Sequence, residues 1–374
     1  MYQKLPEMNG RFVSEFGMEA YPHLDTLHSF ITDSTQQYPG SRIMDFHNKA
    51  IGHERRLLTY VAENFRIKYD LASFTHLTQV MQADAMAWAY KSWRRWWNKP
   101  GARHCGGALV WQLNDCWPTI SWAVVDYFLI KKPAFYAIKR AMEPLAVGVA
   151  RNFRDWTTRP ADSLWQRDTA HVNPVQDSAD LTFDVWVANA TLETKTAKVV
   201  LRFISINDGS DVVAPWEASL TLQANGTTDV YRAAKLEGTT RLGTDNAFSV
   251  DLSDPFVIYA SLCIDGKEIH NDASWPDPIK YLTFTDRGVR IKSESRHGKT
   301  ELVITAERPV KGFVFGERQG MKFNNNGFDI MPGVPQHVSV TGEATENLKW
   351  MYIESGDQAK GENPEAMGWT YVEK

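Results

Sequence analysis

Cysteine is scarce in this sequence, with three residues in a chain of 374. Three cysteines are too few for a disulfide framework, and the spacing of Cys105, Cys116 and Cys263 matches no zinc-binding pattern. If residues 106–113 form a strand, Cys105 and Cys116 lie roughly 30 Å apart, at about 3.3 Å per residue, and cannot be bridged. The ten histidines are dispersed and no phosphate-binding glycine loop is present, so we predict neither a metal site nor a cofactor.

Long hydrophobic runs and an excess of one sign of charge are also absent. A membrane-spanning helix needs about 20 apolar residues, so we expect no membrane partner. The formal net charge is -4 with basic and acidic residues mixed, which predicts no nucleic-acid partner. The basic pairs are interpreted as solvated surface; they are Arg55-Arg56, Arg94-Arg95 and Lys131-Lys132. The N-terminus has no apolar signal core, which favours an intracellular protein if Met1 is the natural start.

Aromatic residues, in contrast, are abundant, with 14 Trp, 13 Tyr and 18 Phe making up 12% of the chain. Many of them will belong to the hydrophobic core. A tryptophan-rich wall is also a common way to hold a sugar, because the apolar face of a pyranose packs on an indole ring.

A chain of this length is too long for one ordinary domain. Residues 1–144 mix strands and helices in the order strand, helices, strand, helix, as in part of a (β/α) TIM barrel. The predicted strands are residues 10–17 and 108–113, and the predicted helices are residues 24–31, 53–65, Ser73–Trp97 with Ser73 as N-cap, and 133–142 with Pro133 in the first turn. The second strand is nearly continuously apolar, which is typical of a parallel strand covered on both faces.

From about Leu145 the pattern changes to short alternating strands separated by turn residues. Such a pattern predicts all-β sandwiches of the immunoglobulin-like kind. The predicted strands are DLTFDVWVAN, AKVVLRFISI, FVIYASLCI, GVRIKSES, ELVITAE, GFVFGE and QHVSVTG. We expect the segment Trp275–Phe284 to join two sandwiches, so the predicted domains are residues 1–144, 145–284 and 285–374.

Glu15 stands near the end of the first strand, where a charge is costly to bury without a partner. One reading leaves Glu15 in solvent or pairs it with Arg11. The other delivers its carboxylate to the mouth of a site, because strand alternation puts Val13 and Glu15 on one face and catalytic groups of a barrel lie at the C-terminal strand ends. Gly17 then ends the strand, with no steric cost for an unusual backbone angle.

The second strand brings aromatic and polar groups to its own end. Trp111 shares a face with Leu109 and Leu113, and Asp115 and Trp117 follow in the next few residues. An aromatic platform beside a carboxylate suits the cleavage of sugars. The alternative for Trp111 is a packed core indole, and position in the strand alone favours neither reading.

Several segments together resemble the β-mannosidases of glycoside hydrolase family 2, above all the fungal type B enzymes. They are GRFVSEFGMEAYP, HERRLLTYVAENF, GGALVWQLNDCWPTISWAVVDYF, KPAFYAIKRAMEP and WPDPIKYL. The resemblance implies a retaining exo-β-mannosidase, which removes terminal β-D-mannose from β-mannosides, oligosaccharides and glycans. It implies that Glu15 is the nucleophile and that Trp111, Asp115 and Trp117 bind substrate. In relatives the peptide bond after the tryptophan is often cis, so Trp111–Gln112 is the candidate here.

The resemblance also implies that this chain corresponds to the C-terminal portion of such an enzyme. The family's acid/base is the glutamate of an Asn-Glu pair, and this sequence contains no Asn-Glu dipeptide. Glu19 follows Glu15 too closely to replace it, and Asp115 belongs to another family position. We therefore expect the chain alone to be inactive, with open strand edges where further barrel strands would pair.

Two alternatives stay open at this point. The β-rich half could be a non-catalytic carbohydrate-binding or structural fragment. The chain could also belong to a related family 2 glycosidase of different sugar specificity, since galactosidases, glucuronidases and exo-glucosaminidases share this architecture.

Overall fold

A computed structural model describes residues 2–8, 10–50, 52–98, 104–152, 182–236, 241–242, 248–249, 255–296, 299–342, 348–354 and 370–371. The chain forms two compact units. The first comprises Met1–Lys91, Gly107–Met142 and Phe284–Lys374, and the second comprises Ser92–Gly106 and Glu143–Thr283. Among the described residues, no helix combines the length and hydrophobicity needed to cross a bilayer.

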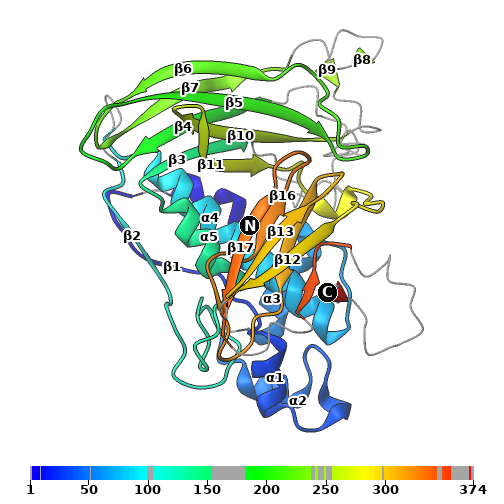
Figure 1. The fold of residues 1–374 in the computed structure, drawn as a ribbon. Helices are drawn as coiled ribbons and strands as arrows, with labels where there is room; N and C mark the ends of the chain where they lie inside the picture. The colour runs from blue at the N-terminus through cyan, green and yellow to red at the C-terminus, as the bar shows by residue number, and fades with distance from the viewer. Residues whose placement is uncertain are drawn as a thin grey trace, which may run out of the picture. The chain divides into compact units, whose positions relative to one another are not determined.

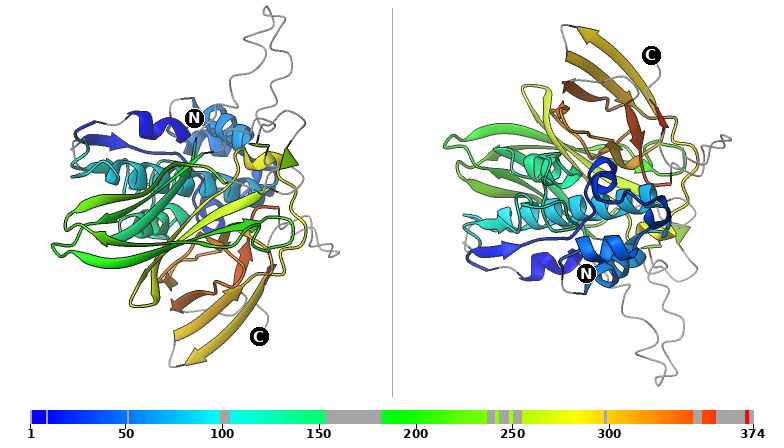
Figure 2. Two further views of the ribbon diagram at one scale, coloured as in Figure 1. Left: turned by 90° about the horizontal axis from the view of Figure 1, so that it is seen from above. Right: turned by 90° about the horizontal axis from the view of Figure 1, so that it is seen from below.

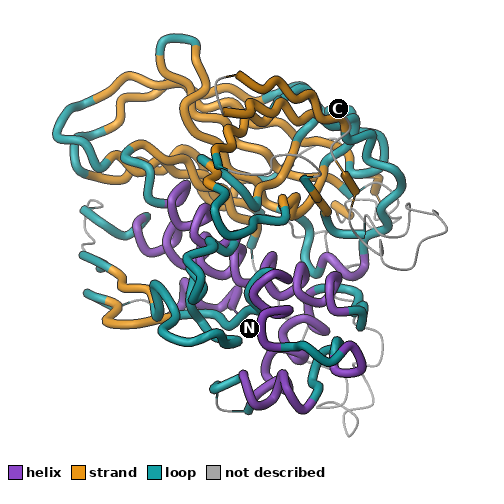
Figure 3. The backbone as a smooth tube through the Cα atoms, turned by 60° about the horizontal axis from the view of Figure 1, so that its bottom comes forward, coloured by secondary structure: helices purple, strands orange, loops and turns teal. Residues whose placement is uncertain are grey.

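The helical part of the first unit contains the predicted helices (Figures 1 and 3). Its elements are η1 Tyr2–Met8, β1 Val13–Phe16, α1 Leu24–Phe30, η2 Ser34–Gln36, α2 Arg42–His47, α3 His53–Asn64, α4 Leu71–Arg94, β2 Ala108–Val110 and α5 Pro133–Ala141. Pro133 occupies the first turn of α5, as predicted, where its missing N–H needs no partner.

Helix α4 begins earlier than its sequence suggests. The Oδ1 atom of Asp70 accepts a hydrogen bond from the backbone N–H of Ser73 at 2.8 Å, so Asp70 caps the helix and Ser73 lies inside its first turn. The prediction of Ser73 as N-cap is therefore wrong. Apolar residues at steps of three and four along this helix belong to the core, because Phe74, Met81 and Ala85 are fully buried.

Strands β1 and β2 form a two-stranded parallel sheet. Val13 pairs with Ala108 and Phe16 with Val110, with a bulge between the two pairs. The prediction of a strand over 108–113 is wrong in length, since β2 ends at Val110. The expected cover on both faces is also missing within the described residues, because Leu109 is exposed.

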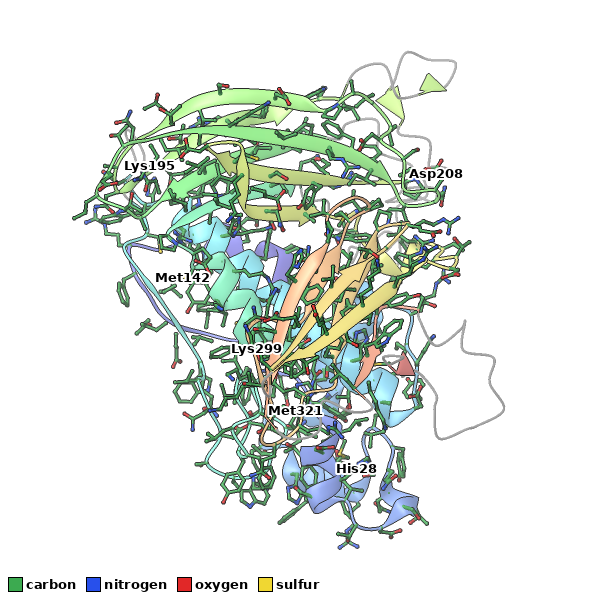
Figure 4. All side chains as sticks on the ribbon, in the orientation of Figure 1. His28, Met142, Lys195, Asp208, Lys299 and Met321 are labelled. Carbon is green, nitrogen blue, oxygen red and sulfur yellow. The ribbon has the colours of Figure 1, made fainter. Side chains whose placement is uncertain are left out.

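The second unit contains a sandwich of two antiparallel sheets (Figure 1). One sheet has the order β11-β10-β5-β6 and the other β3-β4-β7. Their bounds are β3 Leu145–Arg151, β4 Phe183–Asn189, β5 Lys195–Ser205, β6 Trp216–Leu222, β7 Gly226–Ala234, β10 Phe256–Ile264 and β11 Lys267–Ser274; β8 Arg241–Leu242 and β9 Phe248–Ser249 pair separately. Alternate residues of β5 are buried in the core that both sheets share. In Figure 4, Lys195 marks the start of this strand and Asp208 lies just past its end.

The side chain of Arg95, which is 12% exposed, stabilises this sandwich. The guanidinium of Arg95 forms ion pairs with Asp184 at 2.6 Å and Asp229 at 3.0 Å, and it lies 4.7 Å from the ring of Trp186. The interpretation of Arg94-Arg95 as solvated surface is therefore wrong, because both carboxylates and the indole belong to the sheet β3-β4-β7.

The C-terminal strands of the first unit form another pair of sheets, with orders β12-β13-β17-β15 and β16-β14-β18-β19. Their bounds are β12 Arg290–Arg296, β13 Lys299–Thr305, β14 Val310–Phe315, β15 Lys322–Phe323, β16 Phe328–Ile330, β17 Gln336–Thr341, β18 Lys349–Met351 and β19 Thr370–Tyr371. The antiparallel pair β12 and β13 runs side by side in both views of Figure 2. Tyr136 of α5 joins the core of this sandwich, and buried Lys311 pairs with Asp84 of α4 at 2.7 Å and with Asp329 at 3.4 Å.

All seven strands predicted beyond Leu145 are present, and the prediction of two β-sandwiches is confirmed at this level. The segment predicted to join them contains no strand; it has a cis peptide bond between Asp277 and Pro278 and the short helix η5 Ile279–Tyr281. Cys105, Cys116 and Cys263 are all free, in agreement with the prediction that no bridge forms.

Candidate active site

Strand β1 presents Glu15 to solvent. Its neighbour Phe16 is anchored on the opposite face, where its ring meets that of Tyr90 of α4 edge-to-face at 5.1 Å. Because side chains alternate along a strand, anchoring Phe16 on the helix directs Glu15 away from it. Exposure of Glu15 agrees with both readings of this residue, so the position of its neighbours decides between them.

The end of β2 lies beside the end of β1. The backbone N–H of Val13 donates to the carbonyl of Gly107 at 2.9 Å, and that of Trp111 donates to the carbonyl of Phe16 at 2.6 Å. Since the strands are parallel, Glu15 and Trp111 lie at the same edge of the sheet. The Trp111 side chain is 51% exposed, which contradicts the reading of a packed core indole within the described chain.

Gly17 is required for a reason that differs from the predicted one. Its φ angle lies outside the left-handed region, so the expected unusual backbone angle is wrong. A Cβ atom at this position would lie 1.8 Å from the carbonyl oxygen of Trp111, so only glycine permits the close approach of the two strand ends. The peptide bond between Trp111 and Gln112 is cis, as the resemblance implied.

Asp115 lies in the segment that follows β2 and is buried. Its Oδ1 atom accepts hydrogen bonds from the hydroxyl of Ser121 at 2.7 Å and from the side-chain amide of Gln112 at 3.3 Å. Its Oδ2 atom has no hydrogen-bond partner, and burial raises the pKa of this carboxyl. The described contacts of Asp115 therefore hold the residue that follows Trp111.

Trp117 lies farther along the same segment and is 36% exposed. One face of its indole stacks on the imidazole of His47, with ring centroids 4.4 Å apart and planes inclined by 6°. The rest of the ring faces outward, beside Phe46 and Lys49.

Lys132, which belongs to a basic pair expected at the solvated surface, is 0% exposed. Its ammonium group donates to the carbonyl of Ala20 at 2.9 Å and to that of Ser121 at 3.3 Å. It thereby joins the segment after β1 to the segment after β2. Burial lowers the pKa of Lys132, while the nearby carboxylates of Asp115 and Glu19 act in the opposite direction. A lysine pair in the sequence carries no signal that would reveal this role.

A second buried group also escaped sequence reasoning. Glu19 is 2% exposed, and its carboxyl oxygens make no hydrogen bond of standard geometry, although the side chain of Asn48 interacts with them. Burial, followed by the nearby charge of Glu54, raises the pKa of Glu19 to about 7. Burial likewise raises the pKa of Glu54 to about 7, although its Oε1 atom accepts a hydrogen bond from the hydroxyl of Tyr21 at 2.5 Å.

No group of three histidine, cysteine or carboxylate side chains is placed to hold a metal ion in the described part of the chain. The chemical groups at this edge of the sheet are thus one exposed carboxylate, one exposed indole and the buried contacts that fix them. Such a pair can bind a sugar ring on the indole and present a nucleophile to it.

Comparison with known proteins identifies the family. A family model described as Mannosidase Ig/CBM-like domain matches residues 181–281. β-Mannosidase B of Aspergillus flavus is 43% identical over 356 residues, which cover 94% of this chain and 39% of the relative. This chain is related to the β-mannosidases. The relationship predicted from the sequence motifs is thereby confirmed, and the chain spans 39% of the length of this curated β-mannosidase.

Solved structures agree with the relationship. The crystal structure of a β-D-mannosidase from Dictyoglomus thermophilum matches with a TM-score of 0.71 and 25% identity, over 92% of this chain and 37% of that protein. An exo-chitosanase from Amycolatopsis orientalis matches with a TM-score of 0.64 and 15% identity, over 97% of this chain and 42% of that protein. At that identity the second likeness concerns the fold alone.

Proposed function

We propose that this chain carries the nucleophile and part of the sugar pocket of a retaining exo-β-mannosidase, with Glu15 as the nucleophile. In this proposal β1 and β2 are the last two strands of a (β/α)8 barrel. The observation that carries it is the parallel pairing that leaves exposed Glu15 and exposed Trp111 at one edge of the sheet. Barrel enzymes use this edge, the C-terminal ends of the strands, for their active sites.

The chemistry assigns a separate role to each side chain. The carboxylate of Glu15 attacks the anomeric carbon, the bond from that carbon to the departing oxygen breaks, and a glycosyl-enzyme forms that water then hydrolyses. The indole of Trp111 packs against the apolar face of the terminal mannose. Asp115 takes part by holding Gln112 and thereby the backbone after Trp111, and Trp117 contacts the substrate farther from the reacting carbon.

A second carboxyl group must protonate the departing oxygen, at about 5 to 5.5 Å from the nucleophile in a retaining enzyme. Glu19 and Asp115 do not suit this role, because both are buried. The sequence also contains no Asn-Glu dipeptide of the kind that supplies the acid in related enzymes. The proposal therefore includes negligible turnover by this chain alone.

The proposed substrates are β-mannosides, including oligosaccharides and glycans that end in β-D-mannose. The preference for mannose follows from the names of the relatives. A glycosidase of another sugar specificity would share the same fold, and no contact of Glu15 or Trp111 distinguishes the sugars.

A non-catalytic sugar-binding sandwich is the other candidate. In the described part of the second unit, the rings of Phe183, Phe203 and Trp216 pack against one another at 5.1 to 5.7 Å as part of its core. These rings do not provide a flat exposed platform of the kind that binds sugar. The match of residues 181–281 to a Mannosidase Ig/CBM-like domain speaks for that candidate, but these core rings do not add to it.

The direct test is hydrolysis of an aryl β-mannoside by the whole chain and by Glu15→Gln. We expect negligible release of the phenol by both proteins, with weak mannose binding that Trp111→Ala abolishes. Robust turnover that Glu15→Gln abolishes would reveal an acid/base within this chain. Glycan binding that survives both Glu15→Gln and deletion of residues 1–144 would support the sandwich candidate instead.

A further inference from the structure

We propose that Phe46 and Trp117 form a second sugar platform, which holds the pyranose next to the terminal mannose on the leaving-group side. The inference rests on the proposed function for the position of the first sugar. It adds residues of α2 to the site, which the motifs around Glu15 and Trp111 do not include.

The platform is built on three stacked rings. The imidazole of His47 lies between the ring of Phe30, at 3.9 Å and 7°, and the indole of Trp117, at 4.4 Å and 6°. One ring nitrogen of His47 lies 2.7 Å from the carbonyl oxygen of Pro118, and its own carbonyl accepts from the backbone N–H of Ile120 at 3.1 Å. These contacts fix the indole before any ligand binds, which lowers the entropy cost of binding.

The outward side of this stack is aromatic and exposed. The ring of Phe46 meets the indole of Trp117 edge-to-face at 6.0 Å and is 63% exposed. The ammonium group of Lys49 lies 4.3 Å from the Phe46 ring and 5.0 Å from the Trp117 ring. This ammonium group lies over both rings and donates to the carbonyl of Phe46. Two apolar rings with a flexible hydrogen-bond donor beside them match a pyranose, which has an apolar C–H face and hydroxyl groups at its rim.

Trp117 of the platform lies on the same segment of chain as Trp111. Trp117 follows Trp111 by six residues, so at most ~22 Å of extended chain separates them. The intervening segment is tied down, because the backbone N–H groups of Asp115 and Val125 donate to the carbonyls of Val125 and Leu113 at 3.2 and 2.9 Å. In this proposal an oligosaccharide extends from Trp111 along this segment toward Trp117 and Phe46.

The test compares mannose with a β-1,4-linked mannose disaccharide, each titrated into the whole chain and followed by ligand-observed NMR. The variant is Phe46→Ala, which removes an exposed ring, and the matched control is Tyr69→Ala, which removes a ring that is 62% exposed elsewhere in the same unit. We expect Phe46→Ala to weaken disaccharide binding about two- to tenfold and to leave mannose binding unchanged. Tyr69→Ala should change neither affinity.

The platform would be overturned if Phe46→Ala bound the disaccharide as tightly as the unaltered chain, or lost affinity equally for both sugars. It would also be overturned if the unaltered chain bound neither sugar. Trp111→Ala tests the proposed function separately. If Trp111→Ala binds mannose normally, the assignment of Trp111 to the terminal mannose fails. The platform is then still decided by comparing how Phe46→Ala changes the affinity for the disaccharide and for mannose. Circular dichroism checks that Phe46→Ala is folded. Lys49→Met is a second variant of the platform, and we expect it to weaken binding of the disaccharide but not of mannose.

Discussion

A Cβ atom added to Gly17 would lie 1.8 Å from the carbonyl oxygen of Trp111. On the same strand ends, the N–H of Trp111 donates to the carbonyl of Phe16 at 2.6 Å. Both contacts involve backbone atoms, which cannot rotate away as a side chain could. Gly17 therefore sets the spacing between the strand that carries Glu15 and the strand that carries Trp111.

Gly17→Ala should separate the two strand ends, because a methyl group there overlaps the Trp111 carbonyl. We expect the free energy of unfolding to fall by about 1–3 kcal/mol or more, together with weaker mannose binding. Denaturant titration and a binding assay measure the two effects. Gly10→Ala is the control, since the nearest atom to a Cβ there is 3.8 Å away. Equal stability of both variants would contradict this account of Gly17.

Buried Glu19 and half-buried Glu54 predict a pH-dependent stability. Each carboxyl has a pKa raised from 4.5 to about 7 in the folded protein, mainly by burial. The folded state thus binds protons more tightly than the unfolded state, so the stabilisation is full below pH 4.5 and is lost as the pH rises through 7. At most about 3 kcal/mol is involved for each carboxyl.

Glu19→Gln should reduce this dependence to the part that Glu54 contributes, because an amide stays neutral across the range. Denaturant titrations between pH 5 and pH 8 measure the slope. Glu301→Gln, at an ion-paired side chain that is 50% exposed, should leave the slope unchanged. A slope in Glu19→Gln as steep as in the unaltered chain would show that Glu19 titrates normally.

We predict that Lys132 holds together the segment after β1, at Ala20, and the segment after β2, at Ser121. Lys132→Met removes both hydrogen bonds from its ammonium group and takes away the cation that lies near the buried carboxyl groups of Asp115, Asp126 and Glu19. We expect a loss of about 3–5 kcal/mol in the free energy of unfolding. Lys292→Met, at an exposed position of β12, should stay within about 0.5 kcal/mol. A Lys132→Met protein as stable as the Lys292→Met control would refute this role.

Local periodicity carried most of the fold prediction. The alternation along β5 and β13 and the three-to-four spacing along α4 are strong signals, because one face of each element is buried. The β2 strand was predicted too long because an apolar run does not indicate how far a partner extends. Its pairing with β1 ends at Val110, and Trp111 leaves the strand through the cis peptide bond.

The candidate site was predictable only where a motif carried it. Glu15 and Trp111 could be paired from the strand pattern and the family resemblance. Lys132 and Glu19 could not, since a charged side chain in a sequence reads as surface unless its partners are known. Their burial arises from backbone carbonyls and carboxylates that approach only in the folded chain.

Covalent trapping of Glu15 tests the central claim most directly. With 2-deoxy-2-fluoro-β-mannosyl fluoride, the Glu15 carboxylate would bond to the anomeric carbon as the carbon–fluorine bond breaks and fluoride departs, a step that needs no protonating acid. Peptide mass spectrometry of the reacted chain should find one added 2-fluoromannosyl group on the peptide that contains Glu15, and none in Glu15→Gln. An unlabelled chain, or a label that persists in Glu15→Gln, would contradict the assignment of Glu15 as the nucleophile.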